Sequence, residues 1–183
     1  MQYRETILLK DGRECVLRSG EARDGAEVLA VFNKTHAQTD FLTTYPEENT
    51  FTVEQETAFL QAKAESANEV EVVAEIDGRI VGTAGIESVG GKEKIRHRAT
   101  FGIGIDRAYW GLGLGRAMTE ACVACAKKAG YAQLELDVVA ANERAVALYR
   151  SVGFTEYGRN PRGFRSRLTG WQPLLLMRLE LDG

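Results

Sequence analysis

The sequence has few cysteines, no strong excess of charge of either sign and no long hydrophobic run. Its three cysteines form no disulfide framework, and its formal net charge of −3 argues against a nucleic-acid-binding protein that depends on a general basic field. We find no signal peptide and no apolar span long enough to cross a membrane. The sequence therefore predicts a cytoplasmic protein that binds neither nucleic acid nor membrane.

Two of the cysteines, Cys122 and Cys125, have the spacing of a CxxC motif. No second pair of metal ligands accompanies them, and both lie on the apolar stripe of a predicted helix. We therefore interpret them as buried thiols and predict no metal site and no covalent cysteine route.

The 183 residues, of which 44% are hydrophobic, suffice for one domain over residues 1–183 with a core of its own. Asp11-Gly12 and Asp77-Gly78 are two-residue hairpin turn signals between short strands. Periodicity predicts helices over 21–36 (inward Ala26, Leu29, Ala30, Phe32), 53–67 (inward Ala58, Phe59, Ala62), 114–129 and 142–151. Strands are predicted over 7–10, 14–18, 69–76, 79–87, 101–105, 134–139, 154–157 and 174–181, which indicates a mixed α/β sheet.

One stretch carries the clearest signal: an apolar strand over 101–105 leads through Gly111, Gly113 and Gly115 into an amphipathic helix. Backbone N–H groups at a helix N-terminus attract anions, and glycines let a phosphate approach the main chain. A tight turn that only needs positive φ is the structural alternative. Three glycines at alternate positions directly before a helix favour a phosphate site.

Two common phosphate-binding motifs do not fit this stretch. A P-loop would need Gly-Lys-Ser/Thr, whereas Gly115 is followed by Arg116 and Ala117. A dinucleotide-binding fold would need G-x-G-x-x-G, which no window supplies. A nucleotide-binding domain of another kind stays open, and it predicts tighter binding of ATP or NAD than of coenzyme A.

The stretch resembles the pyrophosphate loop of the GNAT superfamily of N-acetyltransferases, whose pattern is Arg/Gln-x-x-Gly-x-Gly/Ala. Positions 110–115 match it except that Trp110 stands where Arg or Gln is expected. A second stretch resembles the family's Val-(x)3-Asn-x-x-Ala-(x)3-Tyr-(x)3-Gly-Phe, and reads Val138, Asn142, Ala145, Tyr149, Gly153 and Phe154 at the same spacing. The resemblance covers residues 70–157 well.

This resemblance implies an α/β fold with a mostly antiparallel sheet of about seven strands, about four helices and a splayed central strand pair. It implies acetyl-CoA as cosubstrate, with pantetheine paired to backbone at the splay, the pyrophosphate on the loop amides and no metal. The cofactor-binding residues would be Ile103, Gly104, Ile105, Trp110, Gly111, Leu112, Gly113, Leu114, Gly115, Arg116, Ala117, Asn142, Ala145 and Tyr149.

The resemblance also implies catalytic roles. The Tyr149 hydroxyl would face the coenzyme sulfur, although full proton transfer from a phenol near pKa 10 to a thiolate near 8.5 is uphill; a core tyrosine is the alternative. Asn142 would bind the pantetheine arm, and it also suits a helix N-cap. The candidates for the base that deprotonates the amine are Glu87, His97, and a water chain or bulk solvent.

The expected function is direct transfer of an acetyl group to the primary amine of a small molecule in a ternary complex. A protein N-terminus as acceptor and a non-catalytic acyl-CoA sensor are the alternatives. Arg159, Arg162, Arg165 and Arg167 form a basic connection before the last strand, which we interpret as a solvated hairpin or as a site for an acidic group. A homodimer is expected from the resemblance only.

Overall fold

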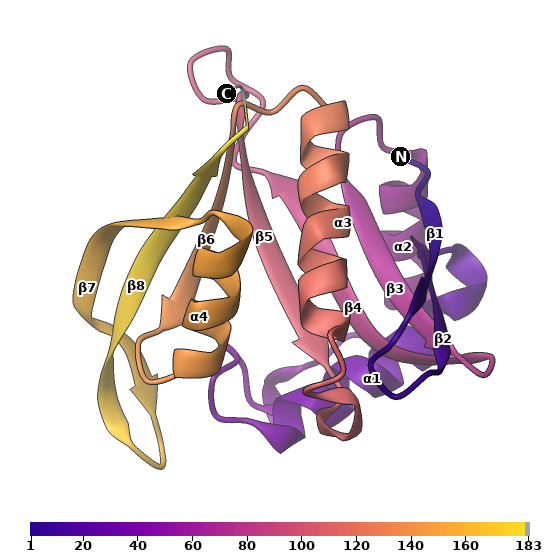
Figure 1. Ribbon diagram of the computed structural model, residues 1–183, viewed down its shortest axis with the longest axis horizontal. Coiled ribbons are helices and arrows are strands. Elements are labelled where there is room, and N and C mark those ends of the chain that lie inside the picture. Colours follow the sequence, from indigo (N-terminus) through magenta and orange to yellow (C-terminus); the bar gives the residue numbers. More distant parts are fainter. Residues whose placement is uncertain (182–183) are drawn as a thin grey trace.

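The computed structural model describes residues 1–181, which form one eight-stranded sheet between two pairs of helices (Figure 1). In chain order the strands and α-helices are β1 (Arg4–Leu8), β2 (Glu14–Ser19), α1 (Gly25–Gln38), α2 (Val53–Glu65), β3 (Val70–Ile76), β4 (Arg79–Ser88), β5 (Arg98–Ile105), α3 (Leu114–Lys128), β6 (Gln133–Val139), α4 (Glu143–Val152), β7 (Thr155–Ser166) and β8 (Gly170–Glu180). Among the described residues, no helix is both long enough and apolar enough to cross a membrane.

The sheet order is β1-β2-β3-β4-β5-β6-β8-β7, and among the described strands only β5 and β6 run parallel to each other. These two strands pair over Arg98–Thr100 with Gln133–Glu135 and then separate. Where β5 and β6 are still paired, Arg98 of β5 forms an ion pair with Glu135 of β6, and Arg98 Nη2 lies 2.7 Å from Glu135 Oε2. Beyond Thr100, β5 keeps β4 on one side and has no strand on the other, while β6 continues along β8 (Figure 1). The expected splayed central pair is confirmed.

Two apolar clusters cover the two faces of the sheet. On one face, α3 and α4 pack over the larger core through residues such as Met118, Cys122 and Val146 (Figure 1). On the other, α1 and α2 enclose a small cluster of Val28, Val31, Leu60, Val73 and Ile80. Burying each such side chain contributes roughly 1.5–3 kcal/mol. This second cluster is much smaller than the first.

The structure corrects three expectations about elements. The arginine-rich stretch is not a connection, because β7 extends to Ser166 after two bulges and pairs with β8 along a long hairpin. The inward face of α1 is Val28, Val31 and Thr35, and Ala26 and Ala30 are exposed. In α2, Glu56, Leu60 and Lys63 are buried while Ala58 and Ala62 are exposed. Alanine carries too little apolar surface to decide which side of a helix faces inward.

Candidate functional site

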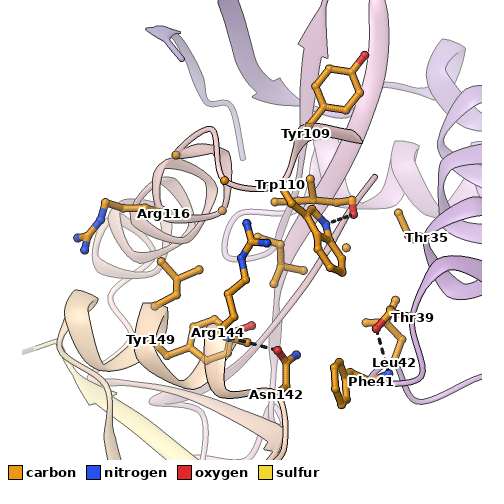
Figure 2. Close-up of a pocket in the computed structure, with 18 of the residues that line it drawn as sticks. Thr35, Thr39, Phe41, Leu42, Tyr109, Trp110, Arg116, Asn142, Arg144 and Tyr149 are labelled. Atoms are coloured by element: carbon orange, nitrogen blue, oxygen red, sulfur yellow. Dashed lines mark hydrogen bonds between the residues drawn. The ribbon is translucent and has the colours of Figure 1, made fainter. Parts of the chain in front are cut away.

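A cavity of about 410 Å³, here called the loop cavity, opens where β5 and β6 diverge. The glycine loop and the start of α3 form one wall, α4 forms the second, and the end of α1 with the segment after it forms the third (Figure 2). Its lining residues are Lys10, Thr35, Thr39, Phe41, Leu42, Ile103, Gly104, Ile105, Tyr109, Trp110, Gly111, Gly113, Gly115, Arg116, Asn142, Arg144, Ala145, Leu148 and Tyr149. The two motifs, about 30 residues apart in the chain, therefore meet in one cavity.

The N-terminus of α3 is built to leave amides free. Gly113, at φ +92°, is the N-cap and offers no side-chain cap, and the first helical hydrogen bond runs from Ala117 N to Gly113 O (3.2 Å). The N–H groups of Leu114, Gly115 and Arg116 thus have no partner within the helix, and the first turn holds no acidic residue. Gly111 also has positive φ (+83°). This arrangement suits a phosphate anion.

Three cationic side chains line the same cavity: Lys10, Arg116 and Arg144. The Arg116 guanidinium is held by Ser151 (2.6 Å) and Glu120 (3.2 Å), which fixes it beside the helix start. Lys10 lies in the β1–β2 turn, and its own backbone N–H donates a hydrogen bond to Leu112 O (3.1 Å). Sequence reasoning missed Lys10 and Arg144. Arg144 lies two residues after Asn142 in the second motif, whereas nothing near Lys10 in the sequence marks it.

Trp110 replaces the polar residue of the family pattern and makes a contact of its own. Its indole Nε1 donates to Ile105 O at 2.8 Å (Figure 2), and the Arg144 guanidinium lies 5.1 Å from its ring centroid. The Ile105 carbonyl, expected to face pantetheine, therefore already has a partner. Ile103 and Gly104 line the cavity on the side of β5 that β6 has left.

Asn142 and Tyr149 lie on α4 and line the loop cavity (Figure 2). Asn142 Oδ1 caps the helix by accepting from Ala145 N (3.3 Å), while no hydrogen bond within residues 1–181 involves its Nδ2. Tyr149 is 8% exposed and packs edge-on against Phe101. Burial raises the pKa of Tyr149 to about 12, and its hydroxyl has no hydrogen-bond partner among the described residues.

A second cavity of about 550 Å³, here called the acidic cavity, lies under α1 and α2 and shares Thr35, Leu42, Ile103 and Gly104 with the loop cavity. Its floor follows the sheet register, in which Glu71 of β3, Gly85 of β4 and Gly102 of β5 are direct neighbours. Its further lining includes Val28, Phe32, His36, Thr43, Asn49, Phe51, Glu56, Phe59, Thr83, Glu87, Thr100 and Phe101. At Gly102 a Cβ would meet no heavy atom within 4 Å, whereas at Gly85 the Glu71 carboxylate occupies the space of the missing side chain.

The carboxylates of the acidic cavity differ in their partners. Glu87 forms an ion pair with Lys63 (3.0 Å), which also binds Glu69 (2.8 Å). No ion pair within residues 1–181 involves the side chain of Glu56 or Glu71. Burial raises the pKa of Glu56, and it raises that of Glu71 to about 7, against the opposing effects of a Thr83 hydrogen bond and the Lys63 charge. Sequence reasoning missed both, although a glutamate inside the apolar run 70–76 is a usable signal.

Most of the expected site residues gather at the loop cavity. Those lining it are Ile103, Gly104, Ile105, Trp110, Gly111, Gly113, Gly115, Arg116, Asn142, Ala145 and Tyr149. Leu112, Leu114 and Ala117 do not line it, and Leu114 packs in the core at 1% exposure. Glu87 lines the acidic cavity. His97 lines neither, because it precedes the far end of β5, where its carbonyl accepts from Ala132 N (2.9 Å).

The remaining predicted features lie outside both cavities. Cys122 and Cys125 are buried free thiols, as expected, and burial raises the pKa of each. Within residues 1–181, no group of three or more His, Cys, Asp or Glu side chains is arranged to hold a metal. None of the hairpin arginines lines a cavity; Arg162 and Arg165 lie over the Trp171 ring at 5.7 and 5.1 Å.

A family model described as the acetyltransferase (GNAT) family matches residues 35–154, more than half of the chain. The chain belongs to the GNAT acetyltransferase family. The matched segment spans every element that forms the loop cavity except the β1–β2 turn with Lys10. The family assignment thus rests on the same residues as the geometry.

Similar proteins include the [ribosomal protein bS18]-alanine N-acetyltransferase of Escherichia coli, 46% identical over 82 residues, which are 45% of this chain and 55% of that protein. The chain thus matches about half the length of this curated relative. A GNAT acetyltransferase structure from Streptococcus pneumoniae has a TM-score of 0.87 at 29% identity, covering 92% of this chain and 99% of that one. Salmonella typhimurium yncA, described with its cofactor acetyl-CoA, has a TM-score of 0.80 at 21% identity, covering 92% and 95%.

Proposed function

We propose that this protein is an N-acetyltransferase that moves the acetyl group of acetyl-CoA to the primary amine of a small molecule by direct attack. The observation that carries this proposal is the meeting of two cavities at Ile103 and Gly104. One cavity has the amides and cations that an anionic donor needs, and the other has carboxylates that suit an amine. A ternary complex would bring the reacting atoms together at the shared residues.

The donor side fits acetyl-CoA in three respects. The free amides at the start of α3, with Lys10, Arg116 and Arg144, would hold the pyrophosphate. The unpaired side of β5 at Ile103 and Gly104 offers backbone groups to an extended pantetheine arm, and Asn142 Nδ2 is a free donor at the opposite wall. Acetyl-CoA itself supplies the activated thioester.

Two groups of this chain would stabilise charge during the transfer. A backbone N–H of the 103–105 segment would hydrogen-bond the thioester oxygen, and such a preorganised donor is worth about 3–4 kcal/mol. The Tyr149 hydroxyl would donate to the departing thiolate. With its pKa near 12, full transfer of its proton to a thiolate near 8.5 would cost about 5 kcal/mol. Tyr149 therefore acts as a hydrogen-bond donor.

The attacking amine must first lose a proton, because an alkylammonium has a pKa of about 10.4. Of the bases expected from the sequence, Glu87 lies in the acidic cavity but is bound by Lys63, and His97 lies outside both cavities. Glu71 lies in the same cavity with its pKa raised to about 7. A carboxylate with that pKa accepts a proton at neutral pH more readily than an ordinary one, so Glu71 joins water as a candidate base.

The shape of the acceptor side favours a small molecule over a folded protein's terminus. A cavity of about 550 Å³ has the size of small-molecule sites. The segment after α1 covers the acidic cavity with Leu42, Thr43 and Asn49. The β7–β8 turn is hydrogen-bonded to this segment. Arg167 N donates to Tyr45 Oη (2.7 Å), and the Ser166 hydroxyl donates to Asp40. A protein chain would have less room to enter past this contact.

The relatives favour another acceptor, a protein N-terminus. The Escherichia coli relative is named for acetylating an alanine of a ribosomal protein, so a protein N-terminus stays the alternative acceptor. Release of coenzyme A from acetyl-CoA, measured against a panel of small amines and a panel of short peptides with free N-termini, separates the two. Turnover with small amines supports the proposal. Turnover with peptides alone favours the alternative, and binding of acetyl-CoA without any turnover favours a sensor.

A variant at the cavity floor locates the acceptor. A Cβ at Gly102 would meet no heavy atom within 4 Å, so Gly102→Val directs its side chain into open space at the floor of the acidic cavity. We expect this variant to bind acetyl-CoA normally and to lose turnover with the amine. Equal turnover in the variant and the parent protein would place the acceptor elsewhere.

A further inference from the structure

Two carboxylates of the acidic cavity, Glu56 and Glu71, have no ion-pair partner within residues 1–181. Glu56 of α2 is only 8% exposed, lines the cavity and has no hydrogen-bond or ion-pair partner for its carboxylate among residues 1–181. Glu71 approaches from the floor, lying across Gly85 so closely that a Cβ there would collide with its Oε2. A buried carboxylate without a partner is costly. Glu56 is such a carboxylate, while Glu71 has a hydrogen bond from Thr83 but no ion-pair partner within residues 1–181.

Within the described residues, no cationic side chain forms an ion pair with Glu56 or Glu71, although the Lys63 charge lowers the pKa of Glu71. No lysine or arginine in the described part of the chain lines this cavity. Lys63, the nearest ammonium, is bound by Glu69 and Glu87. His36 is stacked on Phe32, and burial lowers its pKa, which favours the neutral ring at pH 7. The other lining side chains are uncharged, and Phe32, Phe51 and Phe59 are among them.

We propose that the acidic cavity selects an organic di- or polyamine as acetyl acceptor, with one ammonium near Glu71 and a second near Glu56. Such a cation would replace the missing counter-charges, and the phenylalanines would cover its methylene chain. An α-amino acid would bring a carboxylate into a cavity that already holds three. This inference rests on the proposed function, because it names the acceptor of the same reaction.

Three amines of equal chain length test the charge requirement. Cadaverine has two ammonium groups, pentylamine lacks the second, and lysine is cadaverine with a carboxylate added. We expect kcat/KM to be highest for cadaverine, about tenfold or more lower for pentylamine, and lowest for lysine, since a charge-assisted hydrogen bond is worth at least one factor of ten. Lysine as good as cadaverine, or pentylamine equal to it, would overturn the inference.

Variants of Glu56 test whether this residue binds the second ammonium of the diamine. Glu56→Gln should reduce kcat/KM for cadaverine about tenfold, mainly through KM, and should leave pentylamine unchanged. Glu65→Gln, at an exposed position of the same helix outside both cavities, is the matched control and should change neither. An identical loss for both amines in Glu56→Gln would assign Glu56 a structural role and sink the inference.

The same data distinguish this inference from the function on which it rests. If carboxylate-bearing amines are acetylated best, the N-acetyltransferase proposal stands and the diamine acceptor is wrong. If no amine or peptide consumes acetyl-CoA, the proposed function itself fails. Acetylated cadaverine identified by mass spectrometry, together with the expected order of the three amines, supports both.

Discussion

At the scale of single residues, Tyr149 lines the loop cavity, and its hydroxyl has no hydrogen-bond partner within residues 1–181. We predict that Tyr149→Phe lowers kcat about 10- to 100-fold, the worth of a hydrogen bond to a charged leaving group, and leaves acetyl-CoA affinity and stability unchanged. Steady-state kinetics, calorimetry and thermal unfolding measure the three quantities. Tyr131, buried outside both cavities with its hydroxyl bonded to Asn68 (2.7 Å), provides the control. Tyr131→Phe should lose about 1 kcal/mol of stability and keep kcat; an unchanged kcat in Tyr149→Phe would remove that hydroxyl from the reaction.

Glu71 also links the site to the stability of the fold. Its pKa of about 7 lies above the ordinary 4.5, so between these values the folded protein binds more protons than the unfolded chain. Its contribution to folding is therefore most favourable below pH 4.5 and becomes less favourable as the pH rises through 7. We predict that Glu71→Gln unfolds at a higher temperature than the parent protein at pH 8, with a smaller difference at pH 5. Each kcal/mol of added stability should raise the unfolding temperature by roughly 2–4 °C. Glu65→Gln should show no such trend, and a difference independent of pH in Glu71→Gln would contradict the assignment.

At the scale of elements, turn chemistry and strong periodicity were good guides. Asp77 at φ +50° and Gly78 at φ +74° form the expected hairpin turn, and Cys122 and Cys125 lie on the expected buried stripe of α3. The helices α1 and α2 lie close to the expected residues, and Phe59 packs against the small core as expected, but both helices bury polar side chains in place of the expected alanines. Of these polar residues, Thr35 and Glu56 line the acidic cavity and Lys63 binds its Glu87. Polar residues that face a site break the apolar pattern from which a buried face is inferred. The loop cavity was predictable because its groups come from two contiguous motifs, whereas the acidic cavity is assembled by the register of three strands.

The start of α3 supports a test at the same scale. Gly113 (φ +92°) and Gly130 (φ +80°) bracket the helix, and alanine at either position would be strained by about 1–2 kcal/mol. We predict that Gly113→Ala and Gly130→Ala lose similar stability in denaturant unfolding, and that only Gly113→Ala loses coenzyme A affinity, about tenfold or more, because the strain falls on the amides that face the pyrophosphate. Isothermal titration with coenzyme A measures this loss. Equal affinities in the two variants would show that the loop amides do not bind the coenzyme.

At the scale of the whole molecule, the C-terminal hairpin contacts the segment after α1 that lines both cavities. The β7–β8 hairpin extends from the sheet edge, and its turn is held to the segment after α1 (Figure 1). Arg167 stacks on the Tyr45 ring at 4.0 Å and forms an ion pair with Glu47. This segment contributes Phe41 and Leu42 to the loop cavity and Leu42 and Thr43 to the acidic cavity. The contact therefore couples the C-terminal hairpin to the wall that both cavities share.

Removing the contact of Arg167 with Tyr45 and Glu47 should make residues 40–50 more mobile without destabilising the fold. Arg167 is exposed, and exposed ion pairs contribute at most about 1 kcal/mol, so Arg167→Ala should unfold nearly as the parent protein does. We predict a several-fold increase in KM for the amine, little change in kcat or acetyl-CoA affinity, and faster amide hydrogen exchange over residues 40–50. Arg159→Ala, which removes only the Glu156 contact within β7, is the matched control and should change none of these. Equal amide exchange over residues 40–50 in the parent protein, Arg167→Ala and Arg159→Ala would show that the hairpin turn does not restrain this segment. The preference for small acceptors would then come from the cavity volume alone.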